Sequence, residues 1–359
     1  MTPVTVRVPA KVNLQLAVGP LRADGYHDLV TVFHAVSLFD EVTVRSADRT
    51  SVRVTGEDAD AVPAGRANLA ARAAAALAKA AGPGRVAKSA VAIEIRKRIP
   101  MAAGLAGGSA DAAAALVACN ELWQAGLSGP ELSEVAAGIG SDVAFALLGG
   151  TAVGVGRGEQ LTAALAAGTY HWVLAFSAGG LSTPEVYATC DRLRAARAAS
   201  PSQPPRPASS SQPPRLAGPS RPAWPAEPTW PPQPARSPQS ARPQRPPRAA
   251  GPPQLSTELM AALRSADPAA VGPLLANDLQ PAALSLRPGL RRTLSAGREF
   301  GAIGAVVSGS GPTCAFLAAD AGHARELAVS LTGAGVCRAV AQVHGPVHGA
   351  AIIASPEHA

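Results

Sequence analysis

A glycine-rich segment that runs directly into an alanine-rich stretch constrains this chain more than any other feature of its sequence. Residues 100–116 read PMAAGLAGGSADAAAAL, with glycine at positions 104, 107 and 108 and a helix expected from about Ser109. Glycine lets the backbone adopt positive φ and approach a ligand closely. A helix N-terminus offers free N–H groups and a partial positive charge, so such a segment can bind phosphate. The segment alone leaves a second interpretation open, in which it packs a helix tightly against a sheet.

The segment matches neither of two familiar phosphate-binding motifs. It lacks the Gly-Lys-Ser/Thr of a Walker A loop and the GxGxxG spacing of a dinucleotide-binding fold. Apolar residues alternate over 90–96 and predict a strand, which leads through Lys97 and Arg98 into the glycine-rich segment. The predicted order is therefore strand, loop, helix, a common geometry for phosphate binding.

A proline-rich stretch interrupts the second half of the chain. Residues 201–253 contain 19 of the 34 prolines, seven arginines and a single acidic residue. Such a composition cannot bury enough apolar surface to offset the entropy cost of ordering, so residues 198–254 are expected to form a disordered insert of polyproline character. Binding to a partner's groove is one role for it, but a passive surface insertion is favoured. The stretch 201–253 carries +6 of the net charge of +7, so the rest of the chain is close to neutral and has no electrostatic footprint for nucleic acid.

The cysteines and the N-terminus indicate the compartment. The four cysteines, at positions 119, 190, 314 and 337, show neither CxxC pairs nor metal-ligand spacing, which indicates a reducing environment. The N-terminus has no apolar signal segment, and no run of 18 apolar residues occurs. We therefore expect a soluble cytoplasmic protein with no membrane partner. The length of 359 residues suffices for two domains.

Three short stretches place polar side chains beside predicted elements. Lys11 and Asn13 share one face of an alternating N-terminal strand. Tyr26 and His27 follow an Asp-Gly turn, where they could stack on and hydrogen-bond to a planar ligand. Asp142 begins a short apolar helix after a glycine-rich break, where it could accept a proton. Each stretch also has a plain structural interpretation: a solvated edge lysine, a tyrosine that caps the core beside a surface histidine, and an acid that favours the helix dipole.

The remaining pattern alternates helices with strands. Strands are expected at 4–18, 41–46, 51–55, 90–96, in a hairpin at 151–164, at 171–176, in a pair within 305–319 and at 336–343. Helices are expected at 69–81 with Asn68 as the N-cap, from about 109 to 123, from a capping box at 128–131 to 138, and at 185–197, 255–266, 270–279, 288–298 and 323–332. LSTPEVY (181–187) is expected to be extended before its helix. Helices alternating with antiparallel strands predict an α+β second domain.

Five separated segments of the chain occur together in a set order. They are PAKVNLQL (9–16), ADGYHDL (23–29), PMAAGLAGGSADAA (100–113), GSDVAF (140–145) and SGSGPTC (308–314). The set resembles the GHMP kinase superfamily, small-molecule kinases with a glycine-rich phosphate loop unrelated to Walker A. Within it, the first two segments are similar to those of kinases whose acceptor is 4-diphosphocytidyl-2-C-methyl-D-erythritol. The resemblance spans nearly the whole chain outside the insert.

This resemblance implies a two-domain fold of the α/β (α+β) class. An N-terminal ribosomal-protein-S5-like domain for ATP binding and catalysis would cover residues 1–160. A C-terminal ferredoxin-like domain would cover 165–350 and contain the disordered insert 198–254. ATP with Mg²⁺ would bind at the glycine-rich loop, and a small-molecule acceptor would bind in the cleft between the domains. The ligands of the metal and the oligomeric state, monomer or homodimer, stay open.

The resemblance also implies residue roles. Lys11 and Asp142 match the family's catalytic pair: Asp142 would orient the acceptor hydroxyl and take its proton, and Lys11 would keep Asp142 ionised and stabilise the moving phosphoryl group. The residues implied for the nucleotide are Pro100, Met101, Ala102, Ala103, Gly104, Leu105, Ala106, Gly107, Gly108, Ser109 and Ala110, with Asn68 and Lys97. Those implied for the acceptor are Asn13, Tyr26, His27, Phe33, Thr183, Pro184 and Tyr187. The first and last of these tyrosines would sandwich the cytosine, and His27 would select it through edge hydrogen bonds.

The expected function is thus ATP-dependent phosphorylation of the acceptor's 2-hydroxyl, a step of the non-mevalonate route to isoprenoid precursors. One alternative is another GHMP kinase, acting on homoserine, mevalonate or a sugar, although these acceptors have no base for a tyrosine to stack on. A second is a non-catalytic binding protein on the same fold, and a third is nucleic-acid binding through the insert. The family commonly has proline two residues after the catalytic aspartate, where this chain has Ala144; we expect the helix to be retained.

Overall fold

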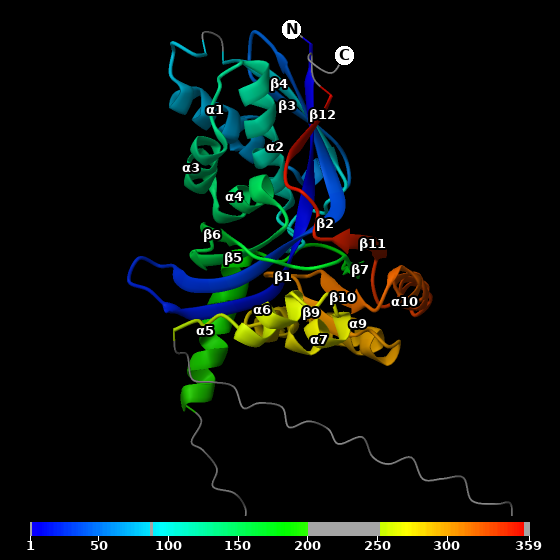
Figure 1. Cartoon of the computed structure of the whole chain (residues 1–359). Helices are drawn as coiled ribbons and strands as arrows, with labels where there is room; N and C mark the ends of the chain where they lie inside the picture. The colour runs from blue at the N-terminus through cyan, green and yellow to red at the C-terminus, as the bar shows by residue number, and fades with distance from the viewer. Residues whose placement is uncertain (1, 87–88, 200–251, 355–359) are drawn as a thin grey trace, which may run out of the picture.

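Two antiparallel-rich β-sheets, each covered by helices, build the molecule (Figure 1). The computed structural model describes residues 2–86, 89–199 and 252–354. The insert expected at 198–254 therefore lies almost entirely outside the described residues. Its C-terminal end is ordered, since the backbone carbonyl of Gln254 accepts a hydrogen bond from the side chain of Gln15 at 2.7 Å.

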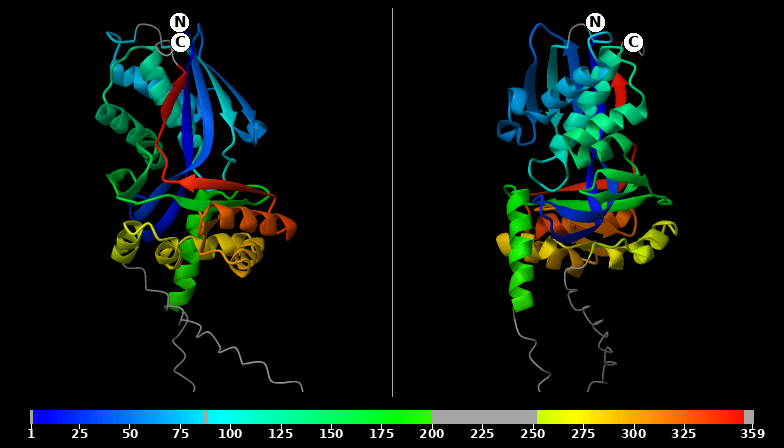
Figure 2. Two further views of the ribbon diagram at one scale, coloured as in Figure 1. Left: turned by 45° about the vertical axis from the view of Figure 1, so that its right-hand side comes forward. Right: turned by 90° about the vertical axis from the view of Figure 1, so that its left-hand side faces the viewer.

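The first sheet has the strand order β12-β1-β2-β4-β3, with β5 and β8 paired to the long strands and β6 paired to β5. Its strands are β1 (Val4–Leu21), β2 (His27–Ser46), β3 (Ser51–Gly56), β4 (Val91–Lys97), β5 (Thr151–Gly156), β6 (Gln160–Ala163), β8 (Ala276–Asn277) and β12 (Ala351–Ala354). β12 was not predicted, and it joins the first sheet from the far end of the chain, beside the start of β1 (Figure 2). The division into domains at 1–160 and 165–350 stays a prediction.

Four helices cover one side of this sheet (Figure 2). They are α1 (Leu69–Ala81), α2 (Gly107–Leu122), α3 (Gly129–Ile139) and α4 (Ser141–Leu148), preceded by the short 3-10 turns η1 (Ala59–Ala61) and η2 (Gly65–Ala67). α2 packs on α1 and on the strands β1 and β2. Its alanines are almost all buried, because small side chains let the helix lie close to the sheet. The expected helix after Asp142 forms with Ala144 inside it.

The second sheet is antiparallel throughout, with the order β11-β7-β10-β9. Its strands are β7 (Tyr170–Phe176), β9 (Gly304–Val307), β10 (Cys314–Ala318) and β11 (Ala339–Gly345). Counted in chain order as 1 to 4 they lie 4-1-3-2, with helices between the first and second and between the third and fourth. This is the βαββαβ arrangement of a ferredoxin-like fold, and the α+β prediction is confirmed.

The helices of the second half are α5 (Thr183–Ala199), α6 (Thr257–Leu263), α7 (Pro268–Val271), the 3-10 turn η3 (Gly272–Leu274), α8 (Gln280–Leu286), α9 (Gly289–Glu299) and α10 (Ala321–Gly333). Two predictions were wrong here. The helix expected at 270–279 ends at Val271, because Gly272 and Pro273 break it and the chain then runs as β8. The segment 181–187 is extended only to 182, because α5 already begins at Thr183, with Pro184 in its first turn, where proline is tolerated.

Alternating side chains of the central strands separate two cores. Tyr170, Trp172 and Leu174 of β7 face the larger core, which they share with the first sheet, whereas Val173 and Ala175 face α9 and α10. β1 reaches both cores: its side chains from Val4 to Leu14 belong to the larger one, and Leu16 and Val18 to the smaller. One long strand thus ties the two sheets together, and its other face is free to line a site between them. Among the described residues, no helix combines the length and apolar character that crossing a bilayer requires.

Candidate active site

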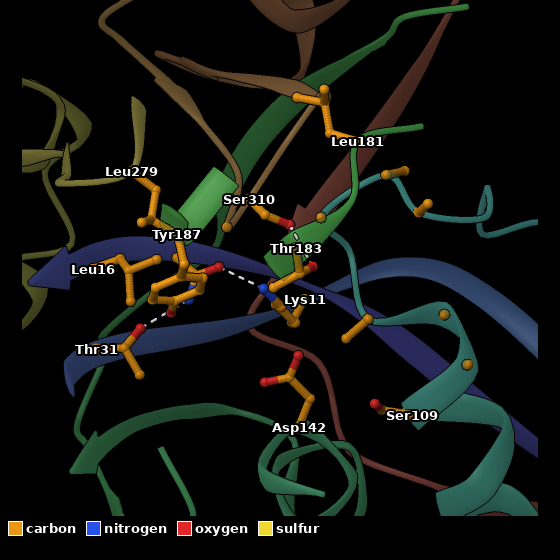
Figure 3. Close-up of a pocket in the computed structure, with 18 of the residues that line it drawn as sticks. Lys11, Leu16, Thr31, Ser109, Asp142, Leu181, Thr183, Tyr187, Leu279 and Ser310 are labelled. Carbon is orange, nitrogen blue, oxygen red and sulfur yellow. Dashed lines mark hydrogen bonds between the residues drawn. The ribbon is translucent and has the colours of Figure 1, made fainter. Parts of the chain in front are cut away.

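A cavity of about 460 Å³ lies where β1, β2, the glycine-rich loop and the first turns of α4 and α5 meet (Figure 3). It brings together the following predicted site residues: Lys11, Asn13, Phe33, Met101, Ala102, Ala103, Gly104, Ala106, Gly107, Gly108, Ser109, Asp142, Thr183, Pro184 and Tyr187. These come from segments as far apart as 11 and 187 in the chain. The other predicted site residues, Pro100, Leu105, Ala110, Asn68, Lys97, Tyr26 and His27, do not line it.

The backbone of the glycine-rich loop has positive φ at every second residue from 102 to 106. Ala102, Gly104 and Ala106 have φ of 48°, 79° and 62°, with residues of the ordinary hand between them. Alternation of this kind turns successive N–H groups toward one side and forms a concave anion seat. Ala106 precedes α2, which has no side-chain cap at its N-terminus. The first N–H groups of α2 are therefore left for an external acceptor.

Gly104 is required by packing as well as by conformation. A Cβ on Gly104 would overlap the carbonyl oxygen of Ser308 in the turn between β9 and β10. The same turn donates from the Ser308 hydroxyl to the Gly104 carbonyl at 3.1 Å, and the Thr313 N–H donates to the Ala103 carbonyl at 3.3 Å. The second sheet therefore holds the loop of the first in place.

Lys97 supports the loop from beneath. Its buried ammonium group contacts the carboxylates of Asp40 at 2.5 Å and Asp111 at 2.8 Å. The other oxygen of Asp40 accepts from the backbone N–H groups of Arg98 and Ile99, immediately before the loop. Burial, together with the nearby negative charge of Asp40, raises the pKa of Asp111 to about 8 in spite of Lys97. Lys97 thus joins the strands β2 and β4 to the first turns of α2, behind the glycine-rich loop.

Asn68 also acts on structure rather than on the cavity. Its side chain accepts from the Ala70 N–H at 2.8 Å and donates to the Pro63 carbonyl at 2.9 Å, which caps α1 as the sequence predicts. The next residue, Leu69, lines the cavity instead.

Lys11 stands at the centre of the cavity. Its ammonium group donates to Asn13 Oδ1 at 2.5 Å, and Asn13 in turn donates to the Thr31 hydroxyl at 2.8 Å (Figure 3). The same ammonium group lies 5.7 Å from the centre of the Phe33 ring. Burial lowers the pKa of Lys11, and the charge of Asp142 partly opposes that shift. No carboxylate of the described residues lies within ion-pair distance of Lys11, so Asp142 faces it across open space.

The aromatic end of the cavity is built differently from the sequence expectation. Tyr187 lines it, and its ring centre lies 5.1 Å from that of His27. His27 is buried, and its Nε2 lies 3.1 Å from both carboxylate oxygens of Asp191. Tyr26 is 53% exposed and contacts the guanidinium group of Arg157, 5.1 Å above its ring. His27 thus orients the ring of Tyr187, while Tyr26 lies at the rim.

Sequence reasoning missed several residues that line the cavity. Gly309 and Ser310 belong to the SGSGPTC segment, which the sequence singled out but to which no site residue was assigned. A Cβ on Gly309, whose φ is 55°, would lie 3.0 Å from Lys11 Nζ, so this turn covers the lysine closely. Ser310 shares a hydrogen bond of 3.0 Å with Thr183. The glycine and serine content of the turn was the available signal. Thr31 and Arg157 had none, since strand and turn positions do not reveal their neighbours.

Comparisons with known proteins agree with this geometry. Models of the GHMP kinase N-terminal domain and C-terminal domain match residues 68–150 and 259–337. A protein of Mycolicibacterium gilvum named 4-diphosphocytidyl-2-C-methyl-D-erythritol kinase is 51% identical over 99% of this chain and 94% of its own length. One of the same name from Salinispora tropica is 47% identical over 98% of this chain and 94% of its own.

Solved structures extend the likeness to the fold. A crystal structure of 4-(cytidine 5'-diphospho)-2C-methyl-D-erythritol kinase superposes with a TM-score of 0.65 at 29% identity, over 94% of this chain and 98% of that one. A Leishmania major mevalonate kinase superposes with a TM-score of 0.61 over 96% of both chains, and its 12% identity shows the fold alone. The chain therefore belongs to the GHMP kinases, in the family of the 4-diphosphocytidyl-2-C-methyl-D-erythritol kinases.

Proposed function

We propose that this protein transfers the γ-phosphate of ATP to the 2-hydroxyl of 4-diphosphocytidyl-2-C-methyl-D-erythritol. The observation that carries the proposal is that one cavity is lined by an uncapped helix N-terminus with a positive-φ loop, by Lys11 and Asp142, and by the ring of Tyr187. The relatives that share half of the sequence over nearly its full length bear the name of this kinase. The step would serve the non-mevalonate route to isoprenoid precursors.

The phosphates of ATP would bind at the loop and the first turn of α2. The loop has three residues with positive φ, and the N–H groups of Gly107 to Ser109 are free. These backbone groups can bind several phosphate oxygens without a lysine of the Walker type. Mg²⁺ neutralises charge on the phosphates when it is bound. The described residues contain no cluster of three carboxylate, histidine or cysteine side chains for a metal. Ser109, an oxygen donor at the cavity wall in the first turn of α2, would help to hold the ion beside the phosphates.

The acceptor hydroxyl would lie between Asp142 and the phosphate seat. Asp142 would orient it and take its proton as the hydroxyl oxygen attacks phosphorus, while the bond from the γ-phosphorus to the bridging oxygen breaks and ADP leaves. Lys11 would place positive charge where negative charge moves in the transition state. Its burial and its bond to Asn13 fix that position before the substrates arrive.

The base of the acceptor would lie against Tyr187. Stacking on an aromatic side chain gives affinity for any flat base, and hydrogen bonds to the edge of the base then select one base over the others. The nearness of His27 and Asp191 gives this end hydrogen-bonding groups of both kinds. Homoserine, mevalonate and simple sugars have no flat aromatic base to stack on Tyr187, which is why we rank kinases of those acceptors second.

The first experiment measures ADP release by the purified protein with Mg-ATP. The cytidylated methylerythritol is compared with homoserine, mevalonate and no acceptor. ADP release that requires the cytidylated acceptor supports the proposal, and release with another acceptor refutes it. No release with any acceptor would favour a non-catalytic protein, and nucleic-acid binding through the insert would show as salt-dependent affinity that disappears when residues 198–254 are removed.

The second experiment tests the base. Asp142→Asn should fold and bind ATP normally but lose a factor of about 10² to 10⁴ in turnover. Asp48→Asn, at an exposed position, is the matched control and should keep full turnover. Near-normal turnover of the Asp142 variant would remove this residue from the mechanism.

A further inference from the structure

Arg157 is the one cationic side chain besides Lys11 among the described residues that line the cavity. It lies in the tight turn between β5 and β6. No described carboxylate lies within 4.0 Å of its guanidinium group, whereas Arg22, Arg194 and Arg338 are each paired with an acid. The group is held instead by the ring of Tyr26, 5.1 Å away. An arginine at a cavity wall with its charge unneutralised is available to an anionic ligand.

The turn that carries Arg157 is fixed to the catalytic wall. Glu159 accepts from the Arg157 backbone N–H at 2.6 Å, and the Gly158 N–H donates to the Val155 carbonyl at 3.0 Å. A Cβ on Gly158 would lie 3.6 Å from the Cβ of Ser141 and 3.7 Å from the Phe33 ring. Ser141 immediately precedes Asp142, so the turn packs directly beside the proposed base.

The diphosphate of the acceptor needs a cationic partner in the cavity. In the proposed function, the base of the acceptor lies at Tyr187 and its reacting hydroxyl at Asp142, so the diphosphate between them must cross the same wall. Lys11 is engaged with Asn13 and faces Asp142. The remaining cation on that wall is Arg157, and a guanidinium group matches the paired oxygens of phosphates by two parallel hydrogen bonds.

We propose that Arg157 binds the diphosphate of the acceptor and thereby makes the site prefer a nucleoside diphosphate derivative over an uncharged nucleoside. Tyr26 supports it as a positioning residue by holding the guanidinium group in place. This inference rests on the proposed function, since it assumes a cytidylated acceptor.

The test compares binding of cytidine, CMP and CDP to wild-type protein, Arg157→Met, Arg157→Lys and the control Arg53→Met by titration calorimetry. Arg53 lies exposed on β3, away from the cavity. Arg157→Met should weaken CDP about tenfold or more while cytidine changes less than twofold. Arg157→Lys should recover part of the loss, and the control should match wild type. In turnover, the methionine variant should raise the KM of the acceptor and leave the KM of ATP unchanged.

Three outcomes separate this inference from the proposed function. If CDP and cytidine weaken equally, or if neither changes while wild type turns over the cytidylated acceptor, Arg157 does not bind the diphosphate and the proposed function stands. If wild type binds neither ligand and shows no acceptor-dependent ADP release, both are overturned. Thermal unfolding serves as the folding control. A variant that unfolds at the same midpoint temperature as wild type is folded, so its loss of binding does not come from loss of structure.

Discussion

Replacement of Lys97 by methionine should destabilise the protein more than any other single change of a lysine in the described chain. Methionine has a similar length but no charge, so it leaves the carboxylates of Asp40 and Asp111 buried together without their cation. Breaking a buried ion pair from one side costs about 3–5 kcal/mol, because an uncompensated charge remains in the interior. Asp111 already takes up a proton readily, since its pKa is raised to about 8. We therefore expect the cost at pH 7 to lie near the lower end, at about 3 kcal/mol.

Urea unfolding followed by tryptophan fluorescence measures this cost, because Trp172 is fully buried and reports on the core. Lys79→Met, on the exposed side of α1, is the matched control and should change stability by less than about 0.5 kcal/mol. Adding Asp111→Asn to Lys97→Met should change stability little further at pH 7, because Asp111 is already largely protonated there and the loss of Lys97 raises its pKa more. A loss below about 1 kcal/mol for the single variant, or a further loss in the double variant, would refute the view that these three groups form one charge network.

Three further changes test other parts of the structure. Gly104→Ala should abolish ATP binding, measured by calorimetry, because its Cβ would overlap Ser308 and its φ of 79° disfavours alanine, whereas Gly138→Ala, with open space around it, should bind ATP normally. Wild-type stability should fall as pH rises from about 4 to about 8, because over this range Asp111 holds its proton in the folded state and has lost it in the unfolded chain; urea unfolding of Asp111→Asn should lack this slope. Asn68→Ala should lower stability by about 1 kcal/mol through loss of the cap of α1, and no loss in urea unfolding would contradict that role.

The local elements followed from the sequence because their causes are local. Period-two alternation predicts β1 and β4, and an N-cap with a glycine-proline stop predicts α1. The helix predicted at 270–279 failed for two reasons: Gly272 and Pro273 break it locally, and a distant contact holds the residues after them extended. Asn277 donates to the carbonyls of Val307 and Gly309, and these bonds to a segment 30 residues away hold the chain extended. β12 is four residues long and gains its pairing only from β1.

The candidate site divides in the same way. The glycine-rich loop, Lys11 and Asp142 are recognisable from the sequence, because backbone conformation and residue type carry their chemistry. Tertiary packing alone decided the rest: it buried Lys97 between two carboxylates, turned Tyr26 to the rim beside Arg157, and brought the turn of Gly309 over Lys11. The physical reason is that a side chain's charge and orientation depend on neighbours distant in the chain, and only the folded contacts between the two sheets specify which neighbours those are.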